Sequence, residues 1–311
     1  MPLTGGFGNQ LFQLAFCLFL IKVRRQRAII DVSLGKPRKN VDVPAILGII
    51  PDDLKLMQHF SEFTESKFFT KVYGWNLNRA LAKREKQSYF AKAMSIASNA
   101  LFTLRYRKTL STISASDIGY DQKLEMAKAG IYIGYFQTYK FASVPEVFDI
   151  LMRLEISEPS RRYKEVLGQA ETTKPIMLHI RLTDYLSESK FGIPSLDYYR
   201  SAIRTLRETG NNSPIWVFSD DNVKALNIAK AFYEDEKLEF FDEPELNDLE
   251  VWSVMRNCSG FILANSTFSW WAAFLRYHRE SIVCCPKPWF RDLGVPNALI
   301  PEDWISVSHG K

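Results

Sequence analysis

The chain contains 311 residues, of which 46% are hydrophobic and 24% are charged, and its formal net charge is +5. This composition is typical of a globular protein with one large or two ordinary domains, and it excludes a disordered chain, a collagen and a simple coiled coil. The four cysteines lack the spacing of a zinc site or a disulfide framework, which favours a reducing compartment.

The amino-terminal half has few clear elements. Its apolar patterns predict a helix over residues 11–23 and strands over residues 28–32 and 131–136. The longest early apolar run, residues 14–21, is shorter than the roughly 18 residues of a membrane span, and no basic leader precedes a cleavage site. We therefore expect a cytoplasmic protein that is soluble or peripheral on the inner membrane.

One segment of this half has a high net positive charge. Residues 66–110, called here the basic segment, contain ten basic side chains and one acidic one, a net charge of +9. Tyrosine, tryptophan and phenylalanine alternate with these basic residues. Three interpretations stay open: a solvated helical face with inward apolar anchors, a surface for anionic lipid, or a platform for nucleic acid.

The carboxy-terminal half alternates strands with helices, which is typical of a parallel, doubly wound sheet. Ser, Glu, Pro, Arg and Thr are frequent between residues 156 and 175, which favours a hinge there. We expect an α/β fold with two domains, residues 1–160 and 161–311. Strands are predicted over residues 176–181, 215–219, 238–241, 260–264 and 282–285, and helices over residues 196–207, 222–232, 246–257 and 268–277.

A glycine-rich stretch directly precedes the first predicted helix. Glycines before a helix N-terminus let the backbone approach a ligand closely, and the helix dipole favours an anionic group there. A tight turn before a core helix would use the same glycines, so both interpretations stay open. The polar pair at its end favours a ligand contact. The stretch consists of Gly5, Gly6, Phe7, Gly8, Asn9 and Gln10.

The predicted strand over residues 176–181 ends in a histidine and an arginine. Alternation along a strand places His179 and Arg181 on one face. An arginine at the carboxyl end of a strand can hold a diphosphate by paired charged hydrogen bonds and can stabilise the charge on a departing phosphate. The alternative is structural, with an Arg181–Asp184 ion pair beside a buried, hydrogen-bonded histidine.

Polar residues also follow two other predicted strands. Asp220 and Asp221 come after residues 215–219, where a carboxylate can bind a base or ribose, or cap the next helix. Hydroxyl-rich residues come after residues 260–264, where hydroxyls and backbone N–H groups at a helix start suit a phosphate. Ordinary N-capping is the alternative interpretation of this second group, which comprises Asn265, Ser266, Thr267 and Phe268.

Together these stretches predict a site for a nucleotide sugar. The sequence lacks the dinucleotide fingerprint G-x-G-x-x-G and the P-loop motif. It also lacks an Asp-x-Asp metal clamp, so arginine and helix dipoles, with no metal, are expected to neutralise a diphosphate. The signatures of serine hydrolases and zincins are missing as well.

The order of these motifs resembles the alpha-1,2-fucosyltransferases of glycosyltransferase family 11. The resemblance implies a GT-B-like fold in which two Rossmann-like domains face a cleft, with residues 1–160 on the acceptor side and residues 161–311 binding the donor. It also implies an inverting transfer of L-fucose from GDP-beta-L-fucose to a galactoside hydroxyl, without a metal or another cofactor. The motifs are the glycine-rich stretch, Gly134-Tyr135-Phe136-Gln137, His179 to Tyr185, Phe218 to Asp221, and Asn265 to Ala272.

The resemblance also implies roles for single residues. Arg181 would bind the β-phosphate of the donor, Asn9 would contact its sugar, and Asp184 would complete the catalytic group. The base that takes the acceptor proton is Asp184, Glu188 or no side chain. His179 and Asp220 would lie near the nucleoside. The implied donor-binding residues are Gly6, Phe7, Gly8, Gln10, His179, Asp220, Asn265, Ser266, Thr267 and Phe268.

Two departures from the family pattern leave alternatives open. Many relatives have a second arginine where this chain has Leu182, so another nucleotide sugar is an alternative donor. The strand expected before the glycine-rich stretch is cut short here, with only residues 1–4 available. The basic segment carries none of the motifs. We expect it to contact an anionic membrane or a lipid-linked acceptor rather than nucleic acid, although a basic membrane- or nucleic-acid-binding protein remains the alternative function.

Overall fold

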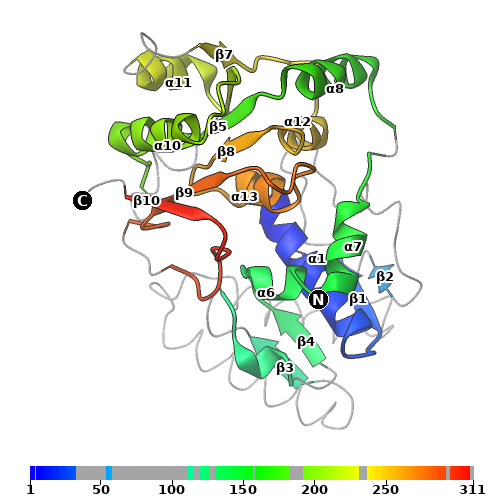
Figure 1. The fold of residues 1–311 in the computed structure, drawn as a ribbon. Helices are drawn as coiled ribbons and strands as arrows, with labels where there is room; N and C mark the ends of the chain where they lie inside the picture. The colour runs from blue at the N-terminus through cyan, green and yellow to red at the C-terminus, as the bar shows by residue number, and fades with distance from the viewer. Residues whose placement is uncertain are drawn as a thin grey trace, which may run out of the picture. The chain divides into compact units, whose positions relative to one another are not determined.

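The computed structural model divides into two compact units (Figure 1). The first unit comprises the described parts of residues 1–153 together with Pro296–Leu299, and the second comprises Leu154–Val295 and the described residues from Ile300 onward. The return of Pro296–Leu299 to the first unit was not predicted. The structure describes residues 1–3, 5–32, 54–57, 111–114, 119–126, 130–156, 158–182, 192–230, 237–291 and 295–308.

The first unit is built on helix α1, Phe7–Lys22, which is buried along almost its whole length. The helix begins inside the glycine-rich stretch, so the predicted start at residue 11 is wrong, and Phe7 to Gln10 form its first turn. Strand β1, Ala28–Asp31, follows and pairs in parallel with β2, Leu54–Met57. Residues 1–3 extend this sheet, because the backbones of Met1 and Leu3 hydrogen-bond to Asp31 at 2.8 and 2.9 Å.

A second small sheet completes the first unit. Strand β3, Ser111–Ser114, pairs in parallel with β4, Gly130–Ile133. The predicted strand over residues 131–136 therefore ends too late, because Phe136 has a left-handed backbone with φ +52°. Its ring stacks on Phe16 of α1 at a centroid distance of 4.4 Å, which joins the two elements in one aromatic core. The short helices of this part are η2 (Gln122–Leu124), α6 (Tyr139–Ala142) and α7 (Pro145–Met152).

The second unit is a parallel sheet covered by helices on both faces, which confirms the predicted α/β class and the doubly wound pattern. Among the described residues the sheet has six strands in the order β10-β9-β8-β5-β6-β7. Every position of the central strand β5 is buried, as expected for a strand covered on both sides. The strands are β5 (Ile176–Ile180), β6 (Ile215–Ser219), β7 (Leu238–Phe240), β8 (Gly260–Ile262), β9 (Val283–Lys287) and β10 (Ile305–Ser308).

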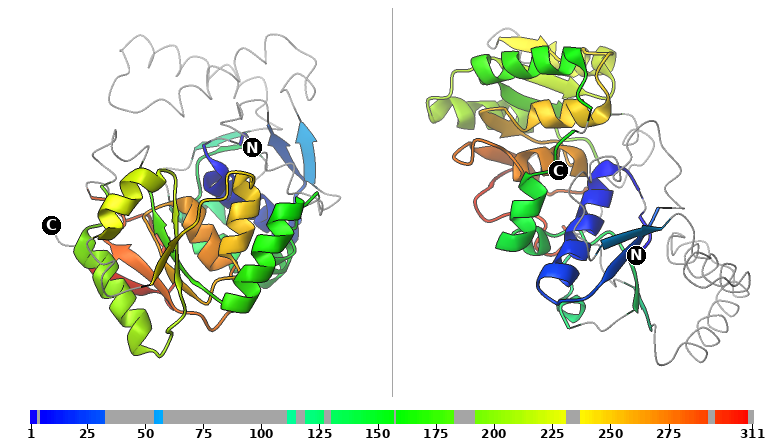
Figure 2. Two further views of the ribbon diagram at one scale, coloured as in Figure 1. Left: turned by 90° about the horizontal axis from the view of Figure 1, so that it is seen from above. Right: turned by 90° about the vertical axis from the view of Figure 1, so that its right-hand side faces the viewer.

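The helices lie on the two faces as right-handed crossovers require. Helices α10 and α11 cover one face, and α8, α12 and α13 cover the other (Figure 2). The predicted helix over residues 222–232 ends early, at Ala229. The helices are α8 (Arg161–Thr173), α10 (Leu196–Glu208), α11 (Asn222–Ala229), α12 (Asp248–Met255) and α13 (Thr267–Phe274).

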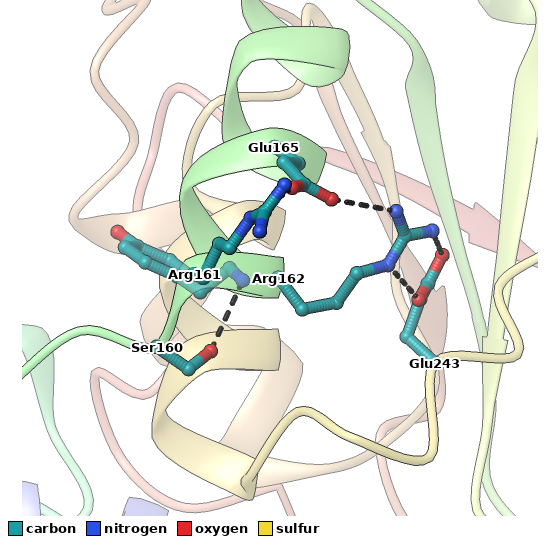
Figure 3. Close-up of polar contacts among 6 residues, drawn as sticks. Ser160, Arg161, Arg162, Glu165 and Glu243 are labelled. Carbon is teal, nitrogen blue, oxygen red and sulfur yellow. Dashed lines mark hydrogen bonds and ion pairs between the residues drawn. The ribbon is translucent and has the colours of Figure 1, made fainter.

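Helix α8 occupies most of the region predicted as a hinge, so that prediction is wrong. Ser160 caps the helix by accepting a hydrogen bond from the backbone N–H of Tyr163 at 3.1 Å. Arg162 binds Glu243 with two hydrogen bonds of 2.8 and 2.6 Å, which attaches the first turn of α8 to the loop after β7 (Figure 3). The polar residues that suggested a hinge are therefore the outer face and the cap of an amphipathic helix.

Candidate functional site

The chain reverses its direction of travel across the sheet at β5. It runs outward through β6 and β7, then returns to the other side of β5 and continues through β8, β9 and β10. In open α/β sheets ligands bind outside the carboxyl ends of the strands at such a switch point. The ends of β5, β6 and β8 carry the three predicted motifs of this unit, so the sheet order brings these motifs to one edge.

Arg181 and Asp220 form an ion pair at this edge. The guanidinium Nε lies 3.2 Å from Asp220 Oδ2, and the two side chains are 28% and 16% exposed. The other carboxylate oxygen of Asp220 accepts a hydrogen bond from the backbone N–H of Leu182 at 2.8 Å. Asp220 is thus held by the loop after β5 and in turn orients the arginine. The alternative, an ion pair between Arg181 and Asp184, stays a prediction, because Asp184 lies outside the described residues.

Asp221, the neighbouring aspartate, has a structural role. Asp221 caps helix α11 by accepting a hydrogen bond from the backbone N–H of Lys224 at 3.0 Å, and its other oxygen lies 2.7 Å from Lys224 Nζ. These bonds to Lys224 lower the pKa of the Asp221 carboxyl. The prediction that one of the two aspartates caps the helix is confirmed for Asp221. Asp220 instead contacts Arg181 at the edge of the sheet.

His179 is buried and neutral. It is 4% exposed, and its Nδ1 lies 2.8 Å from Ser269 Oγ. The Ser269 hydroxyl donates to the carbonyl of Ser266 at 3.2 Å, so it must accept from Nδ1–H, which leaves Nε2 as an acceptor. Burial, assisted by the positive charge of Arg181, lowers the pKa of His179 to about 3. At neutral pH this imidazole contributes hydrogen bonding and no charge.

The hydroxyl-rich residues form the start of helix α13. Ser266 is the N-cap and accepts a hydrogen bond from the backbone N–H of Phe268 at 3.3 Å, so the capping interpretation is confirmed for Ser266. Asn265 Nδ2 donates to the carbonyl of Gly192 at 2.9 Å, which ties α13 to the loop before α10. Thr267 is the first helical residue and half-buried, and its helix start lies at the carboxyl edge of β8.

One carboxylate near Arg181 was not predicted as a site residue. Asp248 is the first residue of α12, next to the capping box of Asn247 and Glu250. Burial raises the pKa of the Asp248 carboxyl, and the positive charge of Arg181 opposes that rise. The capping-box spacing marks this helix start in the sequence, but it carries no information on how close the start lies to Arg181. Sequence analysis therefore missed a second acidic neighbour of the arginine.

The predicted residues of the first unit lie together as well. Gly5 has φ +78°, and Gln10 Nε2 donates to its carbonyl at 3.1 Å, so Gln10 closes the turn before α1. Asn9 Oδ1 accepts a hydrogen bond from Gln137 Nε2 at 2.7 Å. The middle motif, residues 134–137, thus packs against the first turn of α1, where Phe7 and Gly8 are buried.

Gly6 differs from its neighbours because the fold does not require a glycine there. Its φ is −77°, an ordinary value, and a Cβ added to it would meet no atom of the described residues within 4 Å. At Gly5, by contrast, a Cβ would come within 2.7 Å of Asn9 Nδ2. Gly6 is the N-cap of α1, a position that suits glycine, and the space beside it also allows close approach of another molecule.

A family model confirms the type of protein that these motifs indicate. The model for "Glycosyl transferase family 11" matches residues 114–306, which include the middle motif and all three motifs of the second unit. The chain belongs to glycosyl transferase family 11. As a member of this family it is a glycosyltransferase, which confirms the coarse part of the functional prediction.

Two of the relatives of this chain come from Escherichia coli. The "O-antigen biosynthesis glycosyltransferase WbnK" is 26% identical over 98% of this chain and 99% of its own length. An "Alpha-1,2-colitosyltransferase" is 28% identical over 60% of this chain and 67% of its own. Solved structures superpose only loosely: the fucosyltransferase NodZ from Bradyrhizobium has a TM-score of 0.45 and 11% identity over 88% of this chain and 90% of that one. The family assignment therefore rests on sequence.

Several predictions fall on residues outside the described ranges. They concern Asp184 and Glu188 as catalytic residues and the basic segment as a contact surface. The GT-B-like arrangement concerns how the two units face each other, and it stays a prediction.

Within the described part of the chain, no helix is both long enough and apolar enough to span a membrane.

Proposed function

We propose that this glycosyltransferase moves L-fucose from GDP-beta-L-fucose to a galactoside hydroxyl, forming an alpha-1,2 linkage in a surface polysaccharide. The observation that carries the proposal is Arg181, held by Asp220 at the switch point of the sheet beside the start of α13. A guanidinium and a helix N-terminus at one edge are suited to the diphosphate of a nucleotide donor. The names of the two relatives support a glycan acceptor and an alpha-1,2 linkage.

The proposed reaction is a single displacement. The acceptor oxygen bonds to the anomeric carbon while the bond from that carbon to the β-phosphate oxygen breaks, and GDP leaves with the bonding electrons. The hydroxyl proton passes to a carboxylate, for which Asp184 and Glu188 are the candidates, or to solvent. Arg181 stabilises the negative charge that grows on the departing phosphate, an effect that grows toward the transition state and therefore accelerates the step.

Neutral His179 and the carboxylates near Arg181 would complete the donor site. A histidine that stays uncharged can hydrogen-bond a base without adding a second positive charge beside Arg181. Asp220 fixes the position of the guanidinium, so in this proposal its main task is to orient the arginine rather than to bind the nucleoside directly. No metal is needed in this proposal, because the arginine and the helix start neutralise the diphosphate.

A second donor is favoured by two observations. One relative is named an alpha-1,2-colitosyltransferase, and Leu182 stands where many relatives have a second arginine. A colitosyl donor is therefore the alternative to a fucosyl donor. We assign Asp248 and His179 to the nucleotide part of the donor, so they do not discriminate between the two sugars.

A comparison of thermal unfolding midpoints with different donors tests the proposal. The chain would be incubated with GDP-fucose, GDP-mannose, UDP-galactose and GDP alone, because a ligand that binds only the native state raises the midpoint. We expect a clear rise with GDP and the largest rise with GDP-fucose. A rise with UDP-galactose and none with the GDP compounds would contradict the proposal.

We also propose that the basic segment attaches the enzyme to anionic membrane, where a lipid-linked acceptor would be found. The proposal rests on its net charge of +9 and its interleaved aromatic residues. Flotation with vesicles of phosphatidylcholine alone and with added phosphatidylglycerol tests it. Binding is expected only to the anionic vesicles and should decrease with salt. Equal flotation, or none, with both would contradict it.

A further inference from the structure

The turn that follows strand β4 is fixed at both ends. Phe136, at φ +52°, is buried in the aromatic core, and the backbone N–H of Thr138 donates to its carbonyl at 2.8 Å. Thr138 Oγ1 donates to the carbonyl of Ala298 at 2.8 Å and also accepts from the backbone N–H of Lys140. A non-glycine residue held in the left-handed region is a strained feature that the surrounding structure must enforce. The residue that this turn places is Gln137.

Gln137 is buried and contacts the first turn of α1. It is 6% exposed, and its Nε2 donates to Asn9 Oδ1 at 2.7 Å. An asparagine amide can rotate by 180° and exchange its oxygen for its nitrogen at little cost in volume. The hydrogen bond from Gln137 to Oδ1 favours one of these two orientations and directs the Nδ2 edge of the Asn9 amide away from Gln137.

The other edge of the same amide is defined by Gly5. A Cβ at Gly5 would lie 2.7 Å from Asn9 Nδ2 and 3.2 Å from Tyr135 Cε1, so Asn9 Nδ2 lies directly over this glycine. Asn9 itself is half-buried. The oxygen of the amide is therefore engaged by Gln137, while its N–H₂ group lies over the glycine turn that precedes α1.

Stability alone does not account for a glutamine at position 137. Its Oε1 is buried and has no hydrogen-bond partner among the described residues. A buried acceptor without a partner destabilises a fold, whereas an apolar side chain of similar size would avoid that penalty. Gln13, a buried glutamine of the same unit, instead donates to the carbonyl of Gly134 at 2.9 Å and serves as a matched structural control.

We infer that Gln137 is a positioning residue that orients the Asn9 amide so that its N–H₂ group, and not its oxygen, is presented to the substrate. The recognised group would be an oxygen of the nucleotide sugar that accepts a hydrogen bond, either a sugar hydroxyl or a phosphate oxygen. This inference rests on the proposed function and on the sugar contact that the family resemblance implies for Asn9. It extends that function to the middle motif, to which no role has been assigned so far.

A double-mutant cycle tests this inference. Gln137→Leu, Asn9→Ala and the double variant would be compared by kcat and KM for transfer from GDP-fucose to lactose, and by GDP release without acceptor. We expect Gln137→Leu to lower kcat by about 10-fold and Asn9→Ala by about 10²-fold, as for loss of a positioned donor. The double variant should be no slower than Asn9→Ala, because Gln137 acts through Asn9.

Two further variants keep the test decisive. At a pH where its carboxyl is ionised, Gln137→Glu can only accept at this position, so it should turn the Asn9 amide around and lower kcat even though the side chain keeps its size. Gln13→Leu should lower the unfolding midpoint and leave kcat near the wild-type value. If Gln137→Leu does not fold, Gln137→Glu replaces it in the cycle with Asn9→Ala.

The outcomes separate this inference from the proposed function. Multiplicative losses in the double variant, or a wild-type kcat for Gln137→Glu, would overturn the role of Gln137 while leaving the transferase intact. A wild-type chain that turns over no nucleotide sugar would contradict the proposed function. In that case nuclear Overhauser contacts between the Asn9 N–H₂ protons and Gly5 decide: contacts that are lost in Gln137→Leu support the positioning role, and unchanged contacts overturn it.

Discussion

Arg181 is the residue on which the catalytic argument depends most. Its guanidinium is aligned by Asp220, and its charge opposes the rise that burial causes in the pKa of the Asp248 carboxyl. We expect Arg181→Ala to lower kcat by about 10²–10³-fold, the usual effect of removing a donor that stabilises developing charge. Arg181→Lys should recover part of the loss, because it keeps the charge but not the fork of hydrogen bonds.

The control for this prediction is an arginine with the same charge and no site contact. Arg161 is almost fully exposed, and among the described residues its ion pair is with Glu165 on the surface of α8. Arg161→Ala should therefore retain the wild-type kcat. A steady-state transfer assay with GDP-fucose checks both variants, and an Arg181→Ala enzyme as fast as Arg161→Ala would contradict the role of Arg181.

His179 gives a prediction on stability and pH. Its folded pKa of about 3 lies below the unfolded value of 6.5, so the unfolded chain binds the proton first as pH falls. The stability that neutral His179 contributes is complete above pH 6.5 and is lost progressively toward pH 3. Between pH 7.5 and pH 5 the loss should be about 2 kcal/mol.

The variant His179→Gln isolates this contribution from other titrating groups, Arg181 and Asp220 included. Its free energy of unfolding, measured by urea denaturation, should fall about 2 kcal/mol less than that of the wild type over the same pH interval. Equal pH dependence in the two proteins would show that His179 titrates near its ordinary pKa and is not buried as described.

The two glycines before α1 should respond in opposite ways to alanine. Gly5→Ala should lower stability by about 1 kcal/mol or more, because φ is positive and the new Cβ meets Asn9. Gly6→Ala should lower stability by no more than about 1 kcal/mol, since the added Cβ meets no described atom and only the N-cap preference for glycine is lost, yet it should lower transferase activity if substrate approaches there. Full activity in Gly6→Ala would remove the argument for close approach.

At the scale of the elements, α8 and α12 are joined by one buried carboxylate. Glu250 Oε1 accepts from the backbone N–H of Ser160 at 2.7 Å, and Oε2 accepts from that of Asn247 at 3.1 Å. One side chain therefore satisfies the N-cap residues of both helices. The arrangement fixes the start of α12, where Asp248 lies, relative to α8.

Glu250→Ala should destabilise the second unit by about 2–4 kcal/mol, because two buried N–H groups lose their acceptor. Glu165→Ala, on the exposed face of α8, should change stability by less than about 0.5 kcal/mol, as surface ion pairs contribute little. Urea denaturation of both variants checks this. A small effect of Glu250→Ala would mean that water or other groups replace its hydrogen bonds.

The elements show which features the sequence could predict. The predicted strands and helices of the second unit are found because each is an apolar run bounded by polar residues and caps. Strand β10 was missed because three of its four residues are exposed, so it carries little apolar pattern. The start of α1 was misplaced because glycines normally indicate a turn, whereas here Gly8 lies within a buried helix.

The site was predictable in its parts but not in its pairings. Strand-end positions alone indicated His179, Arg181 and Asp220. That Asp220 pairs with Arg181 follows from β6 lying next to β5 in register, with Ile180 opposite Ser219, and a single sequence does not contain that order. The same holds for Asn9 and Gln137, which are 128 residues apart and meet only because the turn after β4 packs on α1.

At the scale of the whole molecule, the family motifs fall in both units. The first contains the glycine-rich stretch and Gln137, and the second contains the Arg181 edge and the start of α13. The mild net charge of +5 describes neither unit well, because the basic segment carries +9, the rest of the chain is net negative, and the segment lies outside every motif. Membership of glycosyl transferase family 11 therefore follows from a few residues at defined positions rather than from composition.

The most direct test of the proposed reaction is the structure of the transfer product. The chain would be incubated with GDP-fucose and lactose, and the product would be analysed by proton NMR for the anomeric configuration and the position of attachment. We predict a fucosyl group in the alpha configuration on O2 of the galactose, the inverted product of a beta-linked donor. A beta-linked product, or no transfer while GDP-fucose binds, would contradict the proposal.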